Sequence, residues 1–278
     1  MAPPTPSSPA GQRRCGKTER EWFHILVNPE DHYADLPVAR GLAQSYLDDT
    51  RARLARGAPV LPAGLAPFPW SPERFAERLE RLYADDLAAG NAYRPADDAV
   101  YTTRARVLER LRQRAPFHQT DGCWLRGVAG VASGPLSDVE AVLLRILYEE
   151  LGEGDAAKNH AALYTSMLAT WGIHLPPVTS AAYAHDARFL DSAFSLPVFQ
   201  LAVSLFPRAF LPEILGMTLY LEWTVPTCLP MVKRMVRHGL DPLFFRVHLG
   251  TDNVDTGHGL LARVRPHFAH TPAVSASP

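Results

Sequence analysis

The stretch His248-Leu-Gly-Thr-Asp252-Asn-Val-Asp255-Thr-Gly-His258 lies near the C-terminus and carries four side chains of types that ligate metals. If it is helical, each residue turns by about 100°, and the two histidines and two aspartates fall within roughly 120° of one helix face. Burying so many polar groups together is costly unless a cation neutralises them. Imidazole together with carboxylate suits divalent iron or manganese. The stretch therefore predicts a metal-binding helix; a polar, solvent-facing helix end is the alternative.

The overall composition indicates a folded protein without a dedicated nucleic-acid surface. Of the 278 residues, 47% are hydrophobic, which is enough to build a full core. The 28 basic and 29 acidic residues give a net charge of −1, which argues against binding to nucleic acid or to an anionic membrane. The N-terminal segment lacks the apolar region of a signal peptide, and no run of about 18 apolar residues predicts a transmembrane helix.

The three cysteines, Cys15, Cys123 and Cys228, are far apart and form no Cys-x-x-Cys pair. This spacing indicates neither a zinc knuckle nor a disulfide framework. We therefore expect a reducing, cytoplasmic setting. The sequence does not set the oligomeric state, and a homodimer is one option.

Hydrophobic periodicity predicts an all-α fold. Apolar residues recur at helical spacing from Glu19 onward, and no segment alternates convincingly with the period of two that is typical of a β-strand. Loops rich in proline and glycine, such as 57–70, separate the helices. The predicted helices cover 36–56, 71–89, 99–115, 137–152, 156–171, 195–206, 210–223, 229–239 and 242–264.

These patterns also predict how the chain is organised. We expect a disordered tail at 1–18, an N-terminal helical region at 19–115, a metal-binding helical core at 116–264 and a second disordered tail at 265–278. Both tails are rich in proline and small residues and poor in the apolar periodicity that a packed helix needs.

A metal site in a helical bundle takes ligands from several facing helices, so the C-terminal stretch needs partners. Glu150 at a predicted helix end and His160, beyond a Gly-x-Gly turn, are one candidate pair; a helix-terminal carboxylate and a surface histidine are the alternative. Glu222 is a further candidate, because it lies in an apolar run where a carboxylate is rarely buried unless it is paired or metal-bound. Glu213, in the first turn of the same predicted helix, fits a structural role at the helix dipole.

Three motifs, in this order along the chain, resemble the iron-containing redox enzyme family, which comprises haem-oxygenase-like diiron oxidases and oxygenases. The motifs are Glu150-Leu-Gly-Glu-Gly…His160, Leu-Glu222-Trp, and His248-x-x-x-Asp252-Asn…Gly-His258. The likeness covers about residues 116–264. It implies a haem-oxygenase-like helical bundle with a non-haem diiron site that activates O₂. The ligands it implies by position are Glu150, His160, Glu222, His248, Asp252 and His258.

The chain also departs from this family pattern. The family has another carboxylate on an earlier core helix, and the nearest residue here is Asp121, which fits loosely and could instead cap the turn at the following glycine. His118 is a weaker candidate beside it. Asp252 and His258 are six residues apart, about 240° on a regular helix, so Asp255 is the alternative carboxylate.

The resemblance implies two ferrous ions, O₂ as a co-substrate, and a small amine, amino-acid-like or fatty-acid substrate, with N-oxygenation, desaturation and C–C cleavage all compatible. It implies no catalytic residue apart from the metal ligands. The family bundle continues as a helix after the His/Asp/His segment, whereas residues 266–278 are rich in Pro, Ala and Ser. We therefore expect the last core helix to be missing, shortened or replaced by an N-terminal helix.

Two other classes of function compete with this interpretation. One is a metal-free helical bundle that acts as a binding or scaffold protein. The other is a metal-free enzyme on the same bundle, either a thiaminase-like hydrolase or a cofactorless oxidase. A hydrolase of that kind would need a reactive cysteine. Cys123 and Cys228 lie in apolar sequence, where a thiol has a raised pKa and low reactivity.

Overall fold

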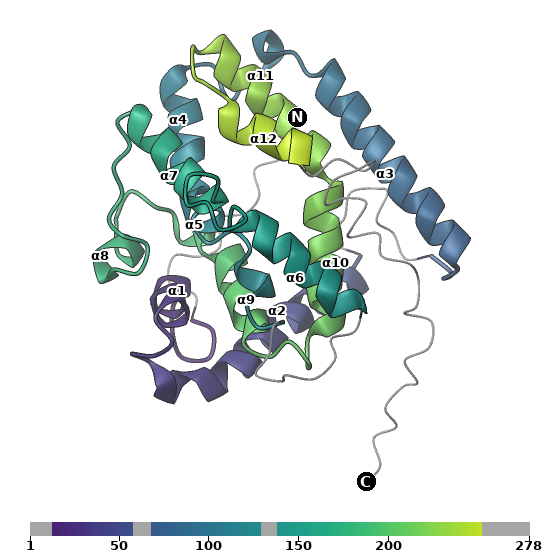
Figure 1. Cartoon of the computed structure of the whole chain (residues 1–278), viewed down its shortest axis with the longest axis vertical. Coiled ribbons are helices and arrows are strands. Elements are labelled where there is room, and N and C mark those ends of the chain that lie inside the picture. Colours follow the sequence, from purple (N-terminus) through teal and green to yellow (C-terminus); the bar gives the residue numbers. More distant parts are fainter. Residues whose placement is uncertain (1–12, 58–67, 129–137, 252–278) are drawn as a thin grey trace.

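The structure, a computed structural model, describes residues 13–57, 68–128 and 138–251. Over this part of the chain it consists of α-helices and short 3-10 helices without a β-strand, which confirms the all-α fold (Figure 1). The α-helices are α1 (Glu19–Val27), α2 (Leu36–Ala55), α3 (Pro72–Ala92), α4 (Arg104–Gln113), α5 (Ala115–His118), α6 (Asp138–Glu150), α7 (His160–Thr170), α8 (Ala181–Ala184), α9 (Ser195–Ser204), α10 (Leu211–Trp223), α11 (Leu229–Arg237) and α12 (Leu243–Thr251).

The start of the described chain differs from the predicted tail, which extended to residue 18. Arg14 and Lys17 exchange two backbone hydrogen bonds, of 2.8 and 3.1 Å, across a turn. Trp22 on α1 donates its indole N–H to the Arg14 carbonyl at 2.7 Å, which holds the turn against the helix. Thr18 then caps α1 in a reciprocal capping box with Glu21. The remainder of the predicted N-terminal tail and all of 265–278 lie outside the described residues.

Two predicted helices begin later than the periodicity indicated, because capping side chains set their first turns. Thr103 accepts from the Arg106 amide at 3.3 Å and starts α4, and Asn159 accepts from the Ala162 amide at 3.0 Å and starts α7. The helix predicted over 242–264 is present as α12 up to residue 251, where the described chain ends.

Helix α9 lies at the centre of the fold. Its residues Val198, Leu201, Ala202 and Val203 are all buried, as expected for a helix that is apolar around its whole circumference. It packs against α1, α2 and the 3-10 helix η4 (Cys123–Leu125). In Figure 1, α1 and α2 lie on one side of α9, and α3, α4, α11 and α12 gather at the other end of the molecule.

Buried polar groups join the helices around this centre. The Trp124 indole N–H donates to the Thr218 hydroxyl at 2.9 Å, which links η4 to α10. The Tyr164 hydroxyl donates to the Leu111 carbonyl at 2.7 Å, which links α7 to α4. Because a buried donor without an acceptor is costly, these bonds fix the relative position of the helices that they join.

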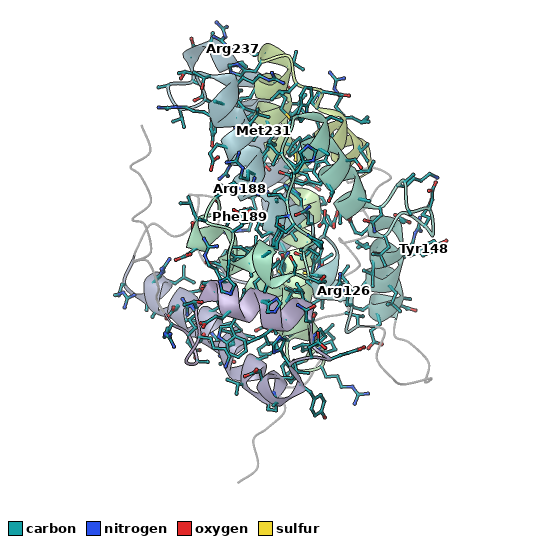
Figure 2. All side chains as sticks on the ribbon, turned by 90° about the vertical axis from the view of Figure 1, so that its left-hand side faces the viewer. Arg126, Tyr148, Arg188, Phe189, Met231 and Arg237 are labelled. Carbon is teal, nitrogen blue, oxygen red and sulfur yellow. The ribbon has the colours of Figure 1, made fainter. Side chains whose placement is uncertain are left out.

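Viewed from the side, the molecule has side chains filling the space between its helices (Figure 2). Met231 of α11 lies among them and is 8% exposed, whereas Tyr148 of α6 lies at the edge and is 55% exposed. None of the helices in the described part of the chain has the length and hydropathy needed to cross a membrane.

Arg20 on α1 fixes the segment between α8 and α9. Its guanidinium donates to the carbonyls of Ala184 at 2.8 Å and Asp186 at 3.1 Å, and it also contacts the Phe189 carbonyl and the Asp191 carboxylate closely. A single partly buried side chain therefore holds four acceptors of a segment that has little regular structure of its own.

We predict that Arg20→Ala lowers the free energy of unfolding by about 3 kcal/mol, because the substitution leaves several partly buried acceptors without their donor. Urea denaturation of the purified protein measures the effect. Arg51→Ala is the control: Arg51 and its partner Asp48 are both exposed, and their ion pair contributes no more than about 1 kcal/mol. Equal losses in the two variants would contradict the role of Arg20.

Candidate metal centre

Asp121 lies in the turn between α5 and η4, and the next residue shapes that turn. Gly122 has a φ of +71°, in the left-handed region that side chains with a Cβ rarely adopt. A Cβ added there would lie 3.3 Å from the Glu150 Cβ and 3.2 Å from the Leu147 Cδ1. Glycine therefore lets the Asp121 turn approach the end of α6 closely.

Glu150 and His160 are brought together by a compact turn between α6 and α7. Glu150 is the last residue of α6 and His160 the first of α7, and they are 4% and 3% exposed. Gly152 has a φ of +81°, and a Cβ there would lie 2.4 Å from the Asp155 carbonyl oxygen and 2.6 Å from the Asn159 amide nitrogen. The glycine permits a turn tight enough to place both side chains on the same side.

His248 reaches the same place from α12. Its Nδ1 lies 2.9 Å from the Phe244 carbonyl oxygen, one turn earlier in the helix. That contact makes Nδ1 the protonated nitrogen and turns Nε2 toward Asp121, whose Oδ2 is 3.6 Å away. A backbone carbonyl that orients an imidazole through its other nitrogen is the usual support of a metal-bound histidine.

The four residues form one cluster from four separate elements of the chain. One ligand atom from each of Asp121, Glu150, His160 and His248 lies within 4.8 Å of every other. The His160 Nδ1 is 2.5 Å from the Glu150 Oε2 and 3.8 Å from the Asp121 Oδ2. The His160 Nδ1 makes no hydrogen bond of acceptable geometry, although it is buried and adjacent to a carboxylate. Two imidazole nitrogens and two carboxylate oxygens that converge this closely are a donor set that a shared cation could bind.

The electrostatics of the cluster also favour a cation. Burial raises the pKa of Asp121, and the neighbouring Glu150 carboxylate raises it further, while His248 opposes the rise. Glu150 lies at the C-terminal end of α6, where the helix dipole is negative and disfavours a carboxylate. A divalent cation would remove both penalties, and two imidazoles with two carboxylates are a donor set that suits iron. The residues present therefore fit an iron ion.

His118 lies beside the cluster but is not one of its four members. It is buried, and its ring packs against Tyr164 and Phe244 at centroid distances of 4.4 and 5.0 Å. Burial, followed by the nearby Arg114 charge, lowers its pKa well below the usual value, so the ring is neutral. Its Nε2 accepts a long hydrogen bond of 3.4 Å from the Arg114 Nε.

The cluster contains some of the residues that the sequence indicated and omits others. The structure brings Glu150, His160 and His248 close together, and Asp121, the loosest match to the family pattern, lies with them. Glu222 is buried on α10, 3% exposed, and is not among the four residues of this cluster. The remaining predicted ligands lie outside the described residues: Asp252, Asp255 and His258.

The signal for Asp121 was present in the sequence, but it was local and ambiguous. An Asp-Gly pair is typical of any tight turn, and the Asp121 carboxylate does bond its own turn, accepting from the Gly122 amide at 3.2 Å. What places Asp121 in the cluster is its proximity to Glu150 and His248, which lie 29 and 127 positions later in the chain. No local pattern encodes that contact.

Fold and site together define an all-α protein with a buried histidine–carboxylate cluster that could hold a metal ion. Residues 108–274 match the family model described as iron-containing redox enzyme. Since the match spans more than half of the chain, the protein belongs to the iron-containing redox enzyme family, which confirms the resemblance found over 116–264. Membership supports an iron-dependent oxidoreductase with a haem-oxygenase-like helical fold. No curated protein and no solved structure matched the chain.

The cysteines give no support to a thiol-dependent hydrolase. Cys123 is fully buried, and burial raises the pKa of its thiol to about 12, so the reactive thiolate is scarce at neutral pH. Cys15 is exposed but lies in the turn before α1, and it is not part of the cluster.

We predict that Gly122→Ala weakens metal binding, because the new Cβ would press on Glu150. The left-handed φ adds about 1–2 kcal/mol of strain. Gly172→Ala is the matched control, since Gly172 has a φ of +76° but nothing within 4 Å of an added Cβ. Both variants should lose similar stability in urea, and only Gly122→Ala should lose affinity for ferrous ion, by about tenfold. Equal iron affinity in the two variants would contradict the proposed contact between the turn and the ligand.

Proposed function

We propose that the protein is a non-haem iron oxygenase or oxidase that activates O₂, and that Asp121, Glu150, His160 and His248 hold one iron ion. The observation that carries this proposal is the convergence of these four side chains from α6, α7, α12 and the turn after α5. The iron would supply the redox chemistry, and the protein would supply geometry, desolvation and specificity.

The residues around the cluster are arranged to hold its ligands in place and to keep water out. The Phe244 ring packs on His248 and on Tyr164, at centroid distances of 4.4 and 4.7 Å. Tyr164 is itself fixed by its bond to the Leu111 carbonyl. Aromatic rings on this side of the cluster lower the local polarity, which strengthens the attraction between the carboxylates and a cation.

We further propose that a second iron binds beside the first, through Glu222, Asp252 and His258, with Asp255 as the alternative carboxylate. Two observations support this assignment. Glu222 is a carboxylate buried on α10, 3% exposed, and carboxylates are ligands that iron takes. Asp252 follows His248 by four residues in the sequence, a spacing that would place both side chains on one face of a regular helix.

The substrate class follows from the family resemblance: a small amine, an amino-acid-like molecule or a fatty acid. The thiol arrangement supports a reducing, cytoplasmic location, because the three cysteines remain free in the structure. We propose no nucleic-acid partner, because the net charge of −1 gives the chain no excess of basic residues to bind phosphates.

We predict about two iron ions per chain after anaerobic reconstitution with ferrous iron, measured by elemental analysis. The double variant Asp252→Ala/His258→Ala should retain about one, since the four-residue cluster remains complete. His160→Gln should lose the ion held by that cluster. His174→Gln is the control, because His174 is exposed and lies outside the cluster.

Each alternative gives a different iron content. One iron per chain in the wild type, unchanged in the double variant, would reject the second iron and keep the first. No iron in a well-folded wild-type protein would reject the proposal and favour a metal-free binding or scaffold bundle. Equal iron content in His160→Gln and His174→Gln would reject the ligand assignment.

We also predict opposite effects of pH on iron binding and on stability without metal. The pKa of Asp121 is raised above its ordinary value of 3.8, so lowering the pH adds a proton that iron must displace, and iron affinity should fall. Without metal, the raised pKa contributes stability at low pH that is lost as the pH rises through the folded-state value. Two measurements across a range of pH test these directions: the affinity for ferrous iron, and the urea midpoint of the metal-free protein. Asp121→Asn should make the stability of the metal-free protein depend less on pH. An unchanged pH dependence would contradict the assignment of this effect to Asp121.

A further inference from the structure

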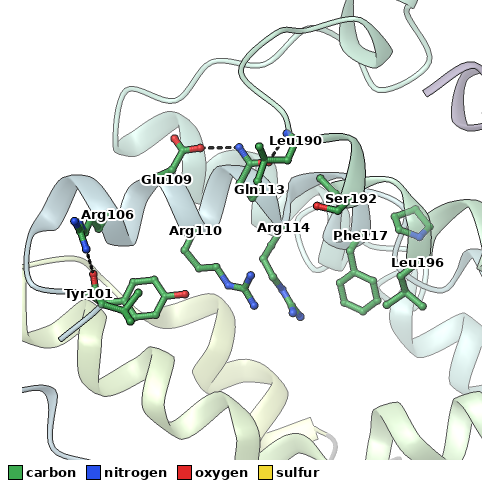
Figure 3. A pocket seen from close by; sticks show the side chains of 13 residues that line it. Tyr101, Arg106, Glu109, Arg110, Gln113, Arg114, Phe117, Leu190, Ser192 and Leu196 are labelled. Atoms are coloured by element: carbon green, nitrogen blue, oxygen red, sulfur yellow. Dashed lines mark hydrogen bonds between the residues drawn. The ribbon is translucent and has the colours of Figure 1, made fainter. Parts of the chain in front are cut away.

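A pocket of about 390 Å³ lies on the surface between α4 and the segment that leads into α9. It is lined by residues of α4 and α5 on one side and by residues 190–197 on the other, and none of the four cluster residues lines it. A volume of this size accommodates a small organic molecule. Figure 3 shows Arg110 and Arg114 extending side by side into this space, with Tyr101 at one end and Phe117 at the other.

The wall of the pocket is fixed by hydrogen bonds. Gln113 of α4 accepts from the Leu190 amide at 2.8 Å (Figure 3). It also donates to the Arg188 carbonyl at 2.7 Å. Arg20 of α1 also holds this segment, because its guanidinium donates to the Phe189 carbonyl and the Asp191 carboxylate. A ligand would therefore meet a preformed wall and would have little ordering cost to offset.

Two of the three arginines that line the pocket lack acidic partners; the third, Arg106, donates to the Val100 carbonyl at 3.0 Å. In the described part of the chain, neither Arg110 nor Arg114 forms an ion pair, whereas Arg112 on the same helix pairs with Glu109. Arg114 is partly buried, and desolvation together with the charge of Arg110 lowers its pKa. Two guanidinium groups one helical turn apart repel each other, and that repulsion is relieved when an anion lies between them.

Part of the pocket lining is apolar and exposed. Leu190 and Leu196 line it and are 63% and 44% exposed, alongside the polar side chains of Glu109, Gln113 and Ser192. A small inorganic anion would leave these two leucines in water. A molecule with a charged end and an apolar portion would cover them while its charge met the arginines.

We propose that this pocket binds an organic carboxylate, with the carboxylate between the guanidinium groups of Arg110 and Arg114 and the apolar portion against Leu190 and Leu196. Guanidinium groups match a carboxylate with paired, charge-assisted hydrogen bonds. The proposal concerns binding alone and does not depend on the iron. The pocket does adjoin the metal centre, because Arg114 contacts His118, whose ring packs against Phe244 and Tyr164.

Calorimetric titration of the purified full chain, without added metal and at low salt, tests the proposal with three probes: hexanoate, its neutral analogue hexanamide, and inorganic phosphate. We expect hexanoate to bind at least about tenfold more tightly than either of the others. Hexanamide lacks the charge, and phosphate lacks the apolar portion.

Variants of the chain locate the binding. Arg110→Gln and Arg114→Gln should each weaken hexanoate binding at least about tenfold. Arg104→Gln, which removes the same charge from the same helix at a position that does not line the pocket, should not. Leu190→Glu places a carboxylate at an exposed position on the rim and should also weaken binding without disturbing the core. His160→Gln should leave hexanoate binding unchanged, which separates this pocket from the metal centre.

Four results would overturn the proposal. They are no binding of hexanoate, equal binding of hexanamide, tighter binding of phosphate than of hexanoate, and hexanoate affinity that is unchanged in Arg110→Gln, Arg114→Gln and Leu190→Glu. Circular dichroism confirms that each variant is folded before it is titrated. If Arg114→Gln fails to fold, Arg110→Gln and Leu190→Glu still decide the outcome, because both of these positions are exposed.

Discussion

Asp121 and Glu150 are two carboxylates held inside the protein with their oxygens and two imidazole nitrogens within 4.8 Å of one another. Such an arrangement is unfavourable by itself, because both carboxylates are desolvated and Glu150 also lies at the negative end of a helix dipole. The chain nevertheless uses several devices to build it. Gly122 and Gly152 adopt left-handed backbone conformations that bring the ends of α5, α6 and α7 together. The Phe244 carbonyl orients the His248 ring through a hydrogen bond from Nδ1. The cation that we propose for this site would explain why these devices converge on one point.

Sequence patterns predicted much of the fold because the helices are amphipathic or apolar and are separated by proline and glycine. The apolar run at 195–206 became the buried central helix α9, and Ser71-Pro72 marked the start of α3. The helices capped by Thr103 and Asn159 were predicted to begin several residues too early. Each true start is set by a single capping side chain, which the hydrophobic periodicity does not reveal. The predicted N-terminal tail was too long. Residues 13–18 are held by a hydrogen bond between Trp22 and the Arg14 carbonyl, and hydrophobic periodicity cannot predict such a contact.

The site was harder to predict than the fold. Glu150, His160 and His248 could be proposed from residue type and order, together with the family resemblance. Asp121 could not be separated from an ordinary turn aspartate, since its role depends on helices that are distant in the sequence. The burial of Glu222 in an apolar run was correctly predicted. Burial alone, however, does not show which group the carboxylate binds. The Arg110 and Arg114 pair gave no sequence signal, because arginines four residues apart are common on solvent-facing helices.

The measurement that tests the central claim most directly is a crystal structure of the iron-reconstituted protein with anomalous diffraction recorded at the iron absorption edge. We predict an anomalous peak within direct bonding distance of ligand atoms of Asp121, Glu150, His160 and His248. An anomalous peak elsewhere in the chain, with these four side chains bonded to one another instead, would contradict it.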